Sequence, residues 1–160
     1  MDFSMSAGRL AGRNGRDGGF TYIGVLVLIA VMGVVLASTG EIWHTVRKRE
    51  KEQELLYVGD QFRRAVKQFY RHSPPQARRY PMSLEELLKD PRYPGIQRYI
   101  RKIYPDPMTG STEWGLIKGP DEQIYGVYSL SEEEPIKKKN FKLADKKFED
   151  KMKYSEWVFI

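Results

Sequence analysis

A long stretch without charge near the start of the chain constrains its fold more than any other feature. From Gly18 to Gly40 no residue is charged, and the part from Phe20 to Ala37 is almost wholly apolar. An α-helix rises about 1.5 Å per residue, so about 20 consecutive apolar residues are needed to cross the hydrocarbon core of a bilayer. The sequence therefore predicts one membrane-spanning helix over residues 20–41.

The residues before this stretch indicate where a precursor would be cut. Residues 1–18 mix glycine with arginine and polar residues and have no apolar period. An ordinary secretory signal carries its cleavage site after the apolar run, so that the run is discarded. Here the small residues Gly18 and Gly19 come directly before the run. A cut at this point would keep the apolar helix in the mature protein.

The segment Gly19-Phe20-Thr21-Tyr22-Ile23 resembles the N-terminus of type IV prepilin-like proteins, particularly the pseudopilins of type II secretion systems. The resemblance implies that a prepilin peptidase removes residues 1–19 as a leader and methylates the new amino terminus at Phe20. It also implies that the retained helix packs into a pilus-like filament. One position departs from the family, which usually has Glu at the fifth mature position, where this chain has Gly24.

The resemblance also supplies the expected location and partners. It implies a single-pass protein of the bacterial inner membrane, with a cytoplasmic N-terminus and a periplasmic C-terminal domain. The expected partners are other pseudopilins or pilins, the prepilin peptidase and an inner-membrane assembly platform. Charge alone gives no orientation, because cations flank the apolar stretch on both sides. These are Arg9, Arg13 and Arg16 before it, and Arg47, Lys48, Arg49 and Lys51 after it.

The helix is expected to continue well past the apolar stretch. Leu55, Phe62, Val66 and Phe69 recur at helical spacing, and Pro74 is the first proline after Phe20. One helix over 20–71 would be about 75 Å long. The alternative is two helices that are broken at Gly40.

The rest of the chain predicts a small α+β domain. Ser83 and Glu86 have the spacing of a capping box, which predicts a short helix ending before Asp90-Pro91. An apolar stripe predicts a second short helix over 96–103. Strands are expected over 113–117 and 124–130, which would form a hairpin, and a third over 154–160. Residues 131–153 are charged and predict an irregular excursion.

The expected architecture is therefore pilin-like. A long N-terminal helix, with its first half transmembrane, packs on a small antiparallel sheet with two short helices. The expected division is 1–19 for the leader, 20–41 for the membrane or filament-core helix, and 42–160 for the rest of the helix and the soluble domain. Three later motifs resemble pseudopilins as well: Tyr80-Pro81-x-Ser83-Leu84-x-x-Leu87, Asp106-Pro107 before Trp114-Gly115, and Val127-Tyr128-Ser129-Leu130.

The sequence carries no recognisable catalytic chemistry. There is no cysteine, and no motif of a hydrolase, nucleotide-binding or zinc-protease site is present. The histidines, His44 and His72, would lie roughly 40 Å apart on one helix. We therefore expect no enzyme, no catalytic residue, no metal and no cofactor. Calcium at Asp121 and Glu122, or at Ser131 with 132–134, is the alternative to a solvated loop.

Small residues inside the apolar stretch predict close helix packing. Four of them fall on one face at spacings of three, four and three, and in lipid such residues let helices approach. With Gly24 at the fifth mature position, the expected packing residues are Gly24, Ala30, Gly33, Ala37 and Gly40.

The expected function is a structural subunit of a type II secretion or pilus-like assembly that serves protein secretion. The absence of a carboxylate at Gly24 favours a minor subunit that starts or caps the assembly. The alternative is a filament lineage that handles the N-terminal amine differently, with this chain as its main subunit. One alternative is a solitary anchored or secreted periplasmic domain, cut at Val35-Leu36-Ala37. Another is a DNA-uptake pilin that uses 137–139. The net charge of +6 is spread along the chain, however, and this favours a solvated surface over nucleic-acid binding.

Overall fold

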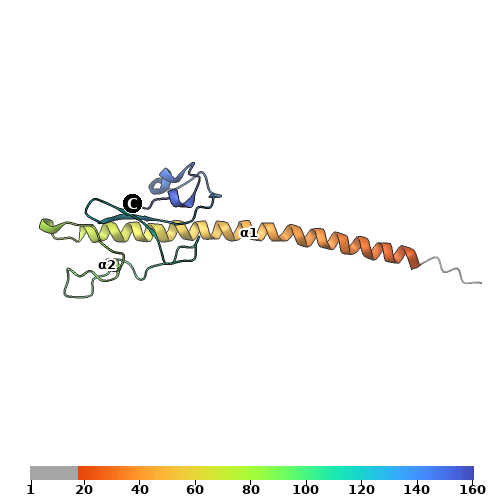
Figure 1. Cartoon of the computed structure of the whole chain (residues 1–160), viewed down its shortest axis with the longest axis horizontal. Helices are drawn as coiled ribbons and strands as arrows, with labels where there is room; N and C mark the ends of the chain where they lie inside the picture. Colours follow the sequence, from red (N-terminus) through yellow and green to blue (C-terminus); the bar gives the residue numbers. More distant parts are fainter. Residues whose placement is uncertain (1–17) are drawn as a thin grey trace, which may run out of the picture. The chain divides into compact units, whose positions relative to one another are not determined.

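The fold is α+β: the described residues form one long helix, one short helix, 3₁₀ segments, which are labelled η, and a two-stranded sheet. The computed structural model describes the backbone of residues 18–160, and the side chains of residues 21–34 and 43–160. The chain divides into two compact units, residues 1–43 and 44–160. Figure 1 shows the elements in chain order. They are α1 (Gly18–Arg71), η1 (Pro75–Ala77), α2 (Glu85–Leu88), β1 (Gly115–Lys118), β2 (Ile124–Tyr128), η2 (Leu143–Phe148) and η3 (Tyr154–Glu156).

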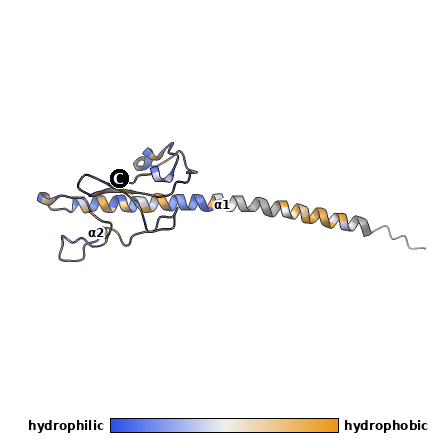
Figure 2. Ribbon diagram, in the orientation of Figure 1, coloured by the Kyte–Doolittle hydropathy of each residue, from blue (hydrophilic) through white to orange (hydrophobic). Residues whose placement is uncertain are grey.

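Helix α1 ends at Arg71, as the sequence predicts. Its described residues 21–34 are uncharged and mostly apolar, whereas polar and apolar residues alternate over 44–71 (Figure 2). Among the residues that the structure describes, no helix has an apolar run long enough to cross a membrane. Phe20 and residues 35–41 of the predicted span lie outside the described side chains, as does the alternative break at Gly40. Residues 1–17 of the predicted leader also lie outside the described part.

The hydrophobic core of residues 44–160 is built against one face of α1. The buried residues of that face recur every three or four positions, as an amphipathic helix requires. They are Leu55, Val58, Phe62, Ala65, Val66 and Phe69. Gly59 lies on the same face, and a Cβ there would come within 2.4 Å of the Phe159 ring. A glycine is therefore needed at this position for the later chain to approach the helix.

Strands β1 and β2 form the predicted hairpin. They pair antiparallel from Gly115 opposite Tyr128 to Lys118 opposite Ile124, with a bulge next to Ile117. In the turn the Gly119 N–H donates to the Gln123 carbonyl at 2.9 Å. The inward side of β2 contributes Val127 to the core, so the sheet lies on α1 through one face.

The predicted third strand over 154–160 is wrong except at one residue pair. Phe159 and Val127 exchange two backbone hydrogen bonds of 2.9 and 3.2 Å, which form an isolated bridge. Residues Tyr154–Glu156 instead form the 3₁₀ turn η3, and the Trp157 N–H donates to the Tyr154 carbonyl at 3.0 Å. Because that N–H is used inside the turn, it cannot continue a ladder with β2.

The second predicted short helix, over 96–103, is also wrong. The N–H groups of Tyr99 and Ile100 both donate to the Leu87 carbonyl, at 2.8 and 3.3 Å. A helix would need those N–H groups for its own carbonyls four residues earlier. The apolar stripe is instead an irregular segment that covers the carboxyl end of α2.

The predicted capping box does not form, although a short helix is present. Helix α2 begins at Glu85, and its N-cap residue Leu84 makes no side-chain capping bond. The Glu86 carboxylate accepts the Met82 N–H at 3.2 Å and pairs with Arg79 at 2.9 Å. In a capping box Glu86 would accept the Ser83 N–H. Here it accepts the N–H of Met82 and pairs with Arg79 instead.

Candidate functional site

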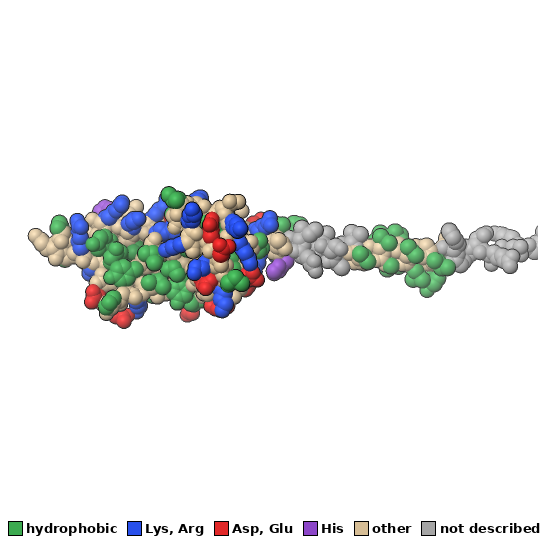
Figure 3. Space-filling model, turned by 90° about the horizontal axis from the view of Figure 1, so that it is seen from above, with side chains coloured by type: hydrophobic (Ala, Val, Ile, Leu, Met, Phe, Trp, Pro, Cys, Tyr) green, Lys and Arg blue, Asp and Glu red, His purple; other side chains and the backbone are tan. Residues whose placement is uncertain are grey.

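Residues 21–34 of α1 expose apolar side chains on every side. The ten large ones in this stretch are between 48% and 69% exposed, and Figure 3 shows hydrophobic side chains gathered along this part of the helix. An exposed apolar surface of this extent is typical of a segment that another molecule or a lipid phase covers. The stretch is therefore the first candidate site.

The predicted packing residues fall on two faces of this helix. Ala30 and Gly33 are three positions apart and share a face. Gly24 lies nine positions before Gly33, about two and a half turns, and therefore faces the opposite direction. A Cβ added at Gly24 or Gly33 would meet nothing within 4 Å. The predicted partners Ala37 and Gly40, and the side chain of the predicted methylation site Phe20, lie outside the described side chains; α1 includes Gly19 near its start.

The C-terminal end of α1 is fixed by a network around Asp90. Arg92 donates to the Phe69 carbonyl at 3.2 Å and pairs with the buried Asp90 carboxylate at 2.6 Å. A cation is favourable where a helix presents its last unpaired carbonyls. Ser73 donates to the same carbonyl at 3.1 Å, and the Tyr99 hydroxyl donates to Asp90 at 2.9 Å.

The ionisation of these groups follows from that geometry. Burial alone would raise the pKa of the Asp90 carboxyl, but the hydrogen bonds from Arg92 and Tyr99 outweigh it and hold the pKa below its ordinary value. Burial, with the hydrogen bond to Asp90, raises the pKa of Tyr99 to about 12. The network is charged on Asp90 and Arg92 and neutral on Tyr99 at neutral pH.

Two of the motifs that resemble pseudopilins, Asp106-Pro107 and residues 127–130, contact each other in the domain. The Asp106 carboxylate is buried and accepts the Ser129 hydroxyl at 2.7 Å. It also accepts the Met108 N–H at 2.9 Å, which closes the turn before β1. The Trp114 indole donates to the Tyr104 carbonyl at 2.8 Å. The aspartate-proline turn, the tryptophan and the serine that follows β2 are thus one structural unit, and their polar groups have roles in folding.

The charged excursion 131–153 is held on α1 by a buried carboxylate. Glu52 is 3% exposed. Its Oε1 accepts the N–H groups of Ile136 and Lys137 at 2.6 and 3.1 Å, and the Tyr154 hydroxyl at 2.8 Å. Burial and the bond to Glu52 raise the pKa of Tyr154 above its ordinary value.

A second buried contact holds the same excursion farther along α1. Arg63 donates to Asp145 at 2.6 Å, and the two side chains are 9% and 8% exposed. Arg63 also pairs with Asp60 at 3.3 Å. Next to this pair, Phe148 stacks on Trp157 with ring centroids 5.5 Å apart. Through Phe148 the excursion therefore joins the hydrophobic core of the domain, in addition to its two polar anchors.

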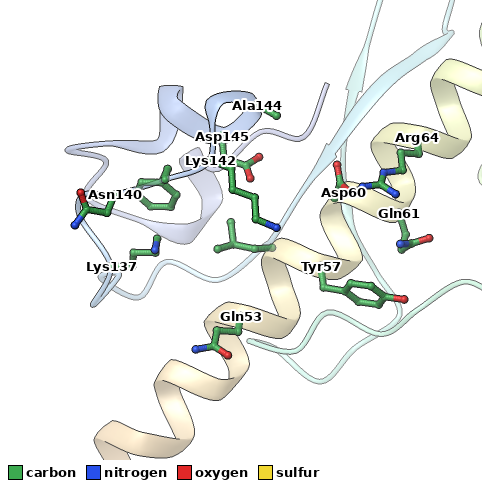
Figure 4. Close-up of a pocket in the computed structure, with 12 residues that line it drawn as sticks. Gln53, Tyr57, Asp60, Gln61, Arg64, Lys137, Asn140, Lys142, Ala144 and Asp145 are labelled. Atoms are coloured by element: carbon green, nitrogen blue, oxygen red, sulfur yellow. Dashed lines mark ion pairs between the residues drawn. The ribbon is translucent and has the colours of Figure 1, made fainter.

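A groove of about 520 Å³ lies between α1 and the part of the excursion that these anchors bracket. Figure 4 shows residues from both sides, with Lys142 extending from the excursion toward α1. The walls are residues Gln53, Leu56, Tyr57, Asp60, Gln61 and Arg64 from α1, and Lys137, Asn140, Phe141, Lys142, Ala144 and Asp145 from the excursion. This groove is the second candidate site.

Sequence reasoning missed the residues that build this groove. Glu52 stands in a charged run and Arg63 beside another arginine, so neither differs from a solvated residue by pattern. Their closeness to the predicted apolar stripe of α1 gave the one indication of burial, since both lie within one helical turn of it. Asp145 sits among lysines and gives no signal at all.

The four glutamates considered for calcium are paired with lysines within the chain. Glu122 pairs with Lys118, Glu132 with Lys153 and Glu133 with Lys48, at 2.6, 2.6 and 2.9 Å. Glu134 pairs with Lys138. Within the described ranges, no three His, Cys, Asp or Glu side chains group closely enough to hold a metal ion.

Comparisons with known proteins gave no match: no family model, no curated protein and no solved structure is similar to this chain at a significant level.

Proposed function

We propose that the chain is a prepilin-like subunit of a type II secretion or pilus-like system. In this proposal it is a minor subunit that starts or caps the assembly. The observation that carries the proposal is the exposed apolar surface of α1 over residues 21–34. Its ten large apolar side chains are 48% to 69% exposed, and a lipid phase or the helices of other subunits would cover them. The leader motif that ends at Gly19 supports the same proposal.

The domain over residues 44–160 supports the finer pilin-like architecture. The second part of α1 packs on the two-stranded sheet, and one short helix follows it. The buried Asp106–Ser129 contact gives a structural role to two of the motifs that resemble pseudopilins. In this proposal the chain acts through helix packing and domain contacts, and it has no catalytic role.

The proposal includes a location and a set of partners. Residues 20–41 would lie in the bacterial inner membrane before assembly and in the filament core afterwards, with residues 42–160 in the periplasm. Other pseudopilins or pilins would cover the apolar surface of α1. The prepilin peptidase would process the precursor, and an assembly platform in the inner membrane would add the subunit to the filament.

The test is the N-terminus of the mature protein. Coexpression of the full chain with a prepilin peptidase should give a product that begins at Phe20 and carries an N-methyl group, as read by mass spectrometry. The Gly19→Val variant should stay uncut, because a side chain directly before the scissile bond would fill the space that glycine leaves open. Gly18→Val is the matched control and should be processed normally.

Two results would count against the proposal. A mature protein that begins at Ser38 would indicate a conventional signal peptidase and a secreted periplasmic domain. A prepilin peptidase requires glycine directly before the bond that it cuts. Normal processing of Gly19→Val would therefore show that another enzyme makes the cut.

A further inference from the structure

The groove between α1 and the excursion has an excess of unpaired positive charge. Its carboxylates are all engaged: Asp60 pairs with Arg64 at 2.6 Å, Asp145 with Arg63 at 2.6 Å, and the neighbouring Glu52 accepts three hydrogen bonds. By contrast, no ion pair within residues 43–160 involves Lys137 or Lys142. The Lys137 ammonium lies 5.1 Å from the centre of the Phe141 ring. The charge that the groove offers to a ligand is therefore cationic.

The groove continues past its central part toward the start of the domain. A second hollow of about 480 Å³ shares Gln53, Leu56, Lys137 and Asn140 with it. This extension adds Arg49 and Lys139, which also have no ion pair in the described part of the chain. The cations thus follow the line of the groove, as an elongated anionic ligand would require.

Amide side chains without partners line the same groove. Gln53 and Gln61 come from α1 and Asn140 from the excursion, and none of these side chains has a hydrogen bond to a described residue. Gln53, Tyr57 and Gln61 are four positions apart, so they form one row along α1. An amide both donates and accepts, which suits the N–H and carbonyl groups of an extended backbone.

We propose that this groove binds an acidic, extended peptide segment of another protein. The carboxylates of the segment would meet Lys137, Lys142 and Lys139, and its backbone would meet the row of amides. Tyr57, which is 59% exposed, and Phe141 would contact its apolar atoms. Phe141 packs edge-on against Phe148 and Trp157. It is therefore a fixed wall of the groove. The row of amides, which can pair with backbone N–H and carbonyl groups, favours a peptide over a nucleic acid.

The inference does not rest on the proposed function. Every residue of the groove lies between Arg49 and Asp145, and none belongs to the leader or to the apolar part of α1. If the chain proves to be a secreted periplasmic domain, the groove and its ligand class are unchanged. Failure of the cleavage test and failure of the binding test are therefore independent.

The test measures binding of a short labelled peptide that alternates Glu and Ser. The full chain in non-ionic detergent should raise the fluorescence anisotropy of this peptide, and added salt should weaken the binding. The same peptide with Gln in place of Glu should bind much less. The double variant Lys137→Gln/Lys142→Gln should weaken binding about tenfold, since two partly exposed charge pairs are lost.

The matched control is Lys146→Gln/Lys151→Gln, which removes the same charge from the excursion outside the groove. It should leave the binding almost unchanged. Ala144→Trp gives a second test that alters no charge, because the indole would fill the groove from its exposed wall. An unchanged unfolding midpoint in each variant shows that folding is intact.

Several outcomes would overturn the inference. Equal losses of peptide affinity in the two double variants would show that the overall charge of the protein attracts the peptide and that the groove does not bind it specifically. Equal binding of the Glu and Gln peptides would exclude recognition of carboxylates. Tighter binding of oligothymidylate than of the acidic peptide, lost in the groove variants, would make the groove a nucleic-acid site. No binding of the acidic peptide would remove the proposal altogether.

Discussion

Two parts of α1 have the same secondary structure and opposite environments. Over residues 21–34 the side chains are apolar on all sides and exposed, and over residues 52–69 they are apolar on one side and that side is buried. The second part finds its partners in the sheet and in the later chain. In the first part the ten large apolar side chains remain 48% to 69% exposed. A helix that buries its apolar face inside its own chain contributes to folding, whereas one that cannot do so depends on lipid or on other chains.

The comparison also separates two kinds of polar residue. The first part has no charge, and the second carries Glu52 and Arg63 within its buried surface. Both are compensated there by fixed partners from the excursion. Buried charges are tolerated only when they are paired and hydrogen-bonded. The excursion is therefore an integral part of the domain, although its composition resembles that of a solvated loop.

The largest expected effect comes from removing a core contact of the second part. Phe62 is fully buried, and its ring centroid lies 5.2 Å from that of Trp114. Phe62→Ala should lower the free energy of unfolding by about 3–5 kcal/mol. Ile29→Ala, in the exposed part of α1, should change it by less than about 0.5 kcal/mol. Denaturant titration of the full chain in detergent, followed by the fluorescence of the buried tryptophans, measures both. Comparable losses in the two variants would show that the first part belongs to the same folding unit.

The sequence predicts those parts of the fold that depend on local patterns. The end of α1 follows from the prolines after Arg71, and the hairpin follows from two β-rich runs around a turn. The segments over 96–103 and 154–160 could not be predicted, because there the backbone bonds to distant residues, Leu87 and Val127, outweigh local preference. The groove also depends on pairing across more than 80 residues, as between Arg63 and Asp145. No local pattern contains that information.

The next effect tests whether the excursion is held by its buried ion pair. Asp145→Asn should lower the free energy of unfolding by about 3 kcal/mol, because Arg63 keeps its charge and loses its best partner. Asp150→Asn, on the same excursion, removes the same charge from an exposed position and should have little effect. Its φ of +61° is one that asparagine accepts readily. The double variant Arg63→Met/Asp145→Leu should recover most of the lost stability. Equal unfolding midpoints for Asp145→Asn and the unaltered protein would contradict the anchoring role.

A smaller effect should appear at high pH through Tyr99. Its pKa is raised from 10.0 to about 12 in the folded protein. The folded state therefore holds the phenolic proton more tightly than the unfolded state does. The contribution of the protonated Tyr99 to the free energy of unfolding is complete below pH 10 and is lost as the pH rises through about 12. It is on the order of 1 kcal/mol once solvent screening is allowed for.

Tyr99→Phe isolates this contribution, because burial also raises the pKa values of Tyr80 and Tyr154 and these groups titrate in both proteins. The difference in unfolding free energy between the unaltered protein and Tyr99→Phe should narrow as the pH rises from neutral to strongly alkaline. Chemical denaturation at a series of pH values gives this difference. A constant difference over that range would mean that Tyr99 titrates normally in the folded state.

The smallest effect on folding, and the most informative one for assembly, is expected at Gly24. A Cβ at this position meets nothing within 4 Å, so Gly24→Glu and Gly24→Gln should both fold, with unfolding free energies close to that of the unaltered protein.

The resemblance to pseudopilins implies that a carboxylate at position 24 neutralises the N-terminal amine of an earlier subunit, where an unpaired charge in an apolar core is costly. Gly24 cannot supply that charge. The unaltered protein should therefore be present in a few copies at one end of the assembly, and Gly24→Glu should raise its copy number. Gly24→Gln has the same size without the charge and should not. Quantitative mass spectrometry of isolated assemblies counts the copies, and an unaltered protein as abundant as the main filament subunit would refute the minor role.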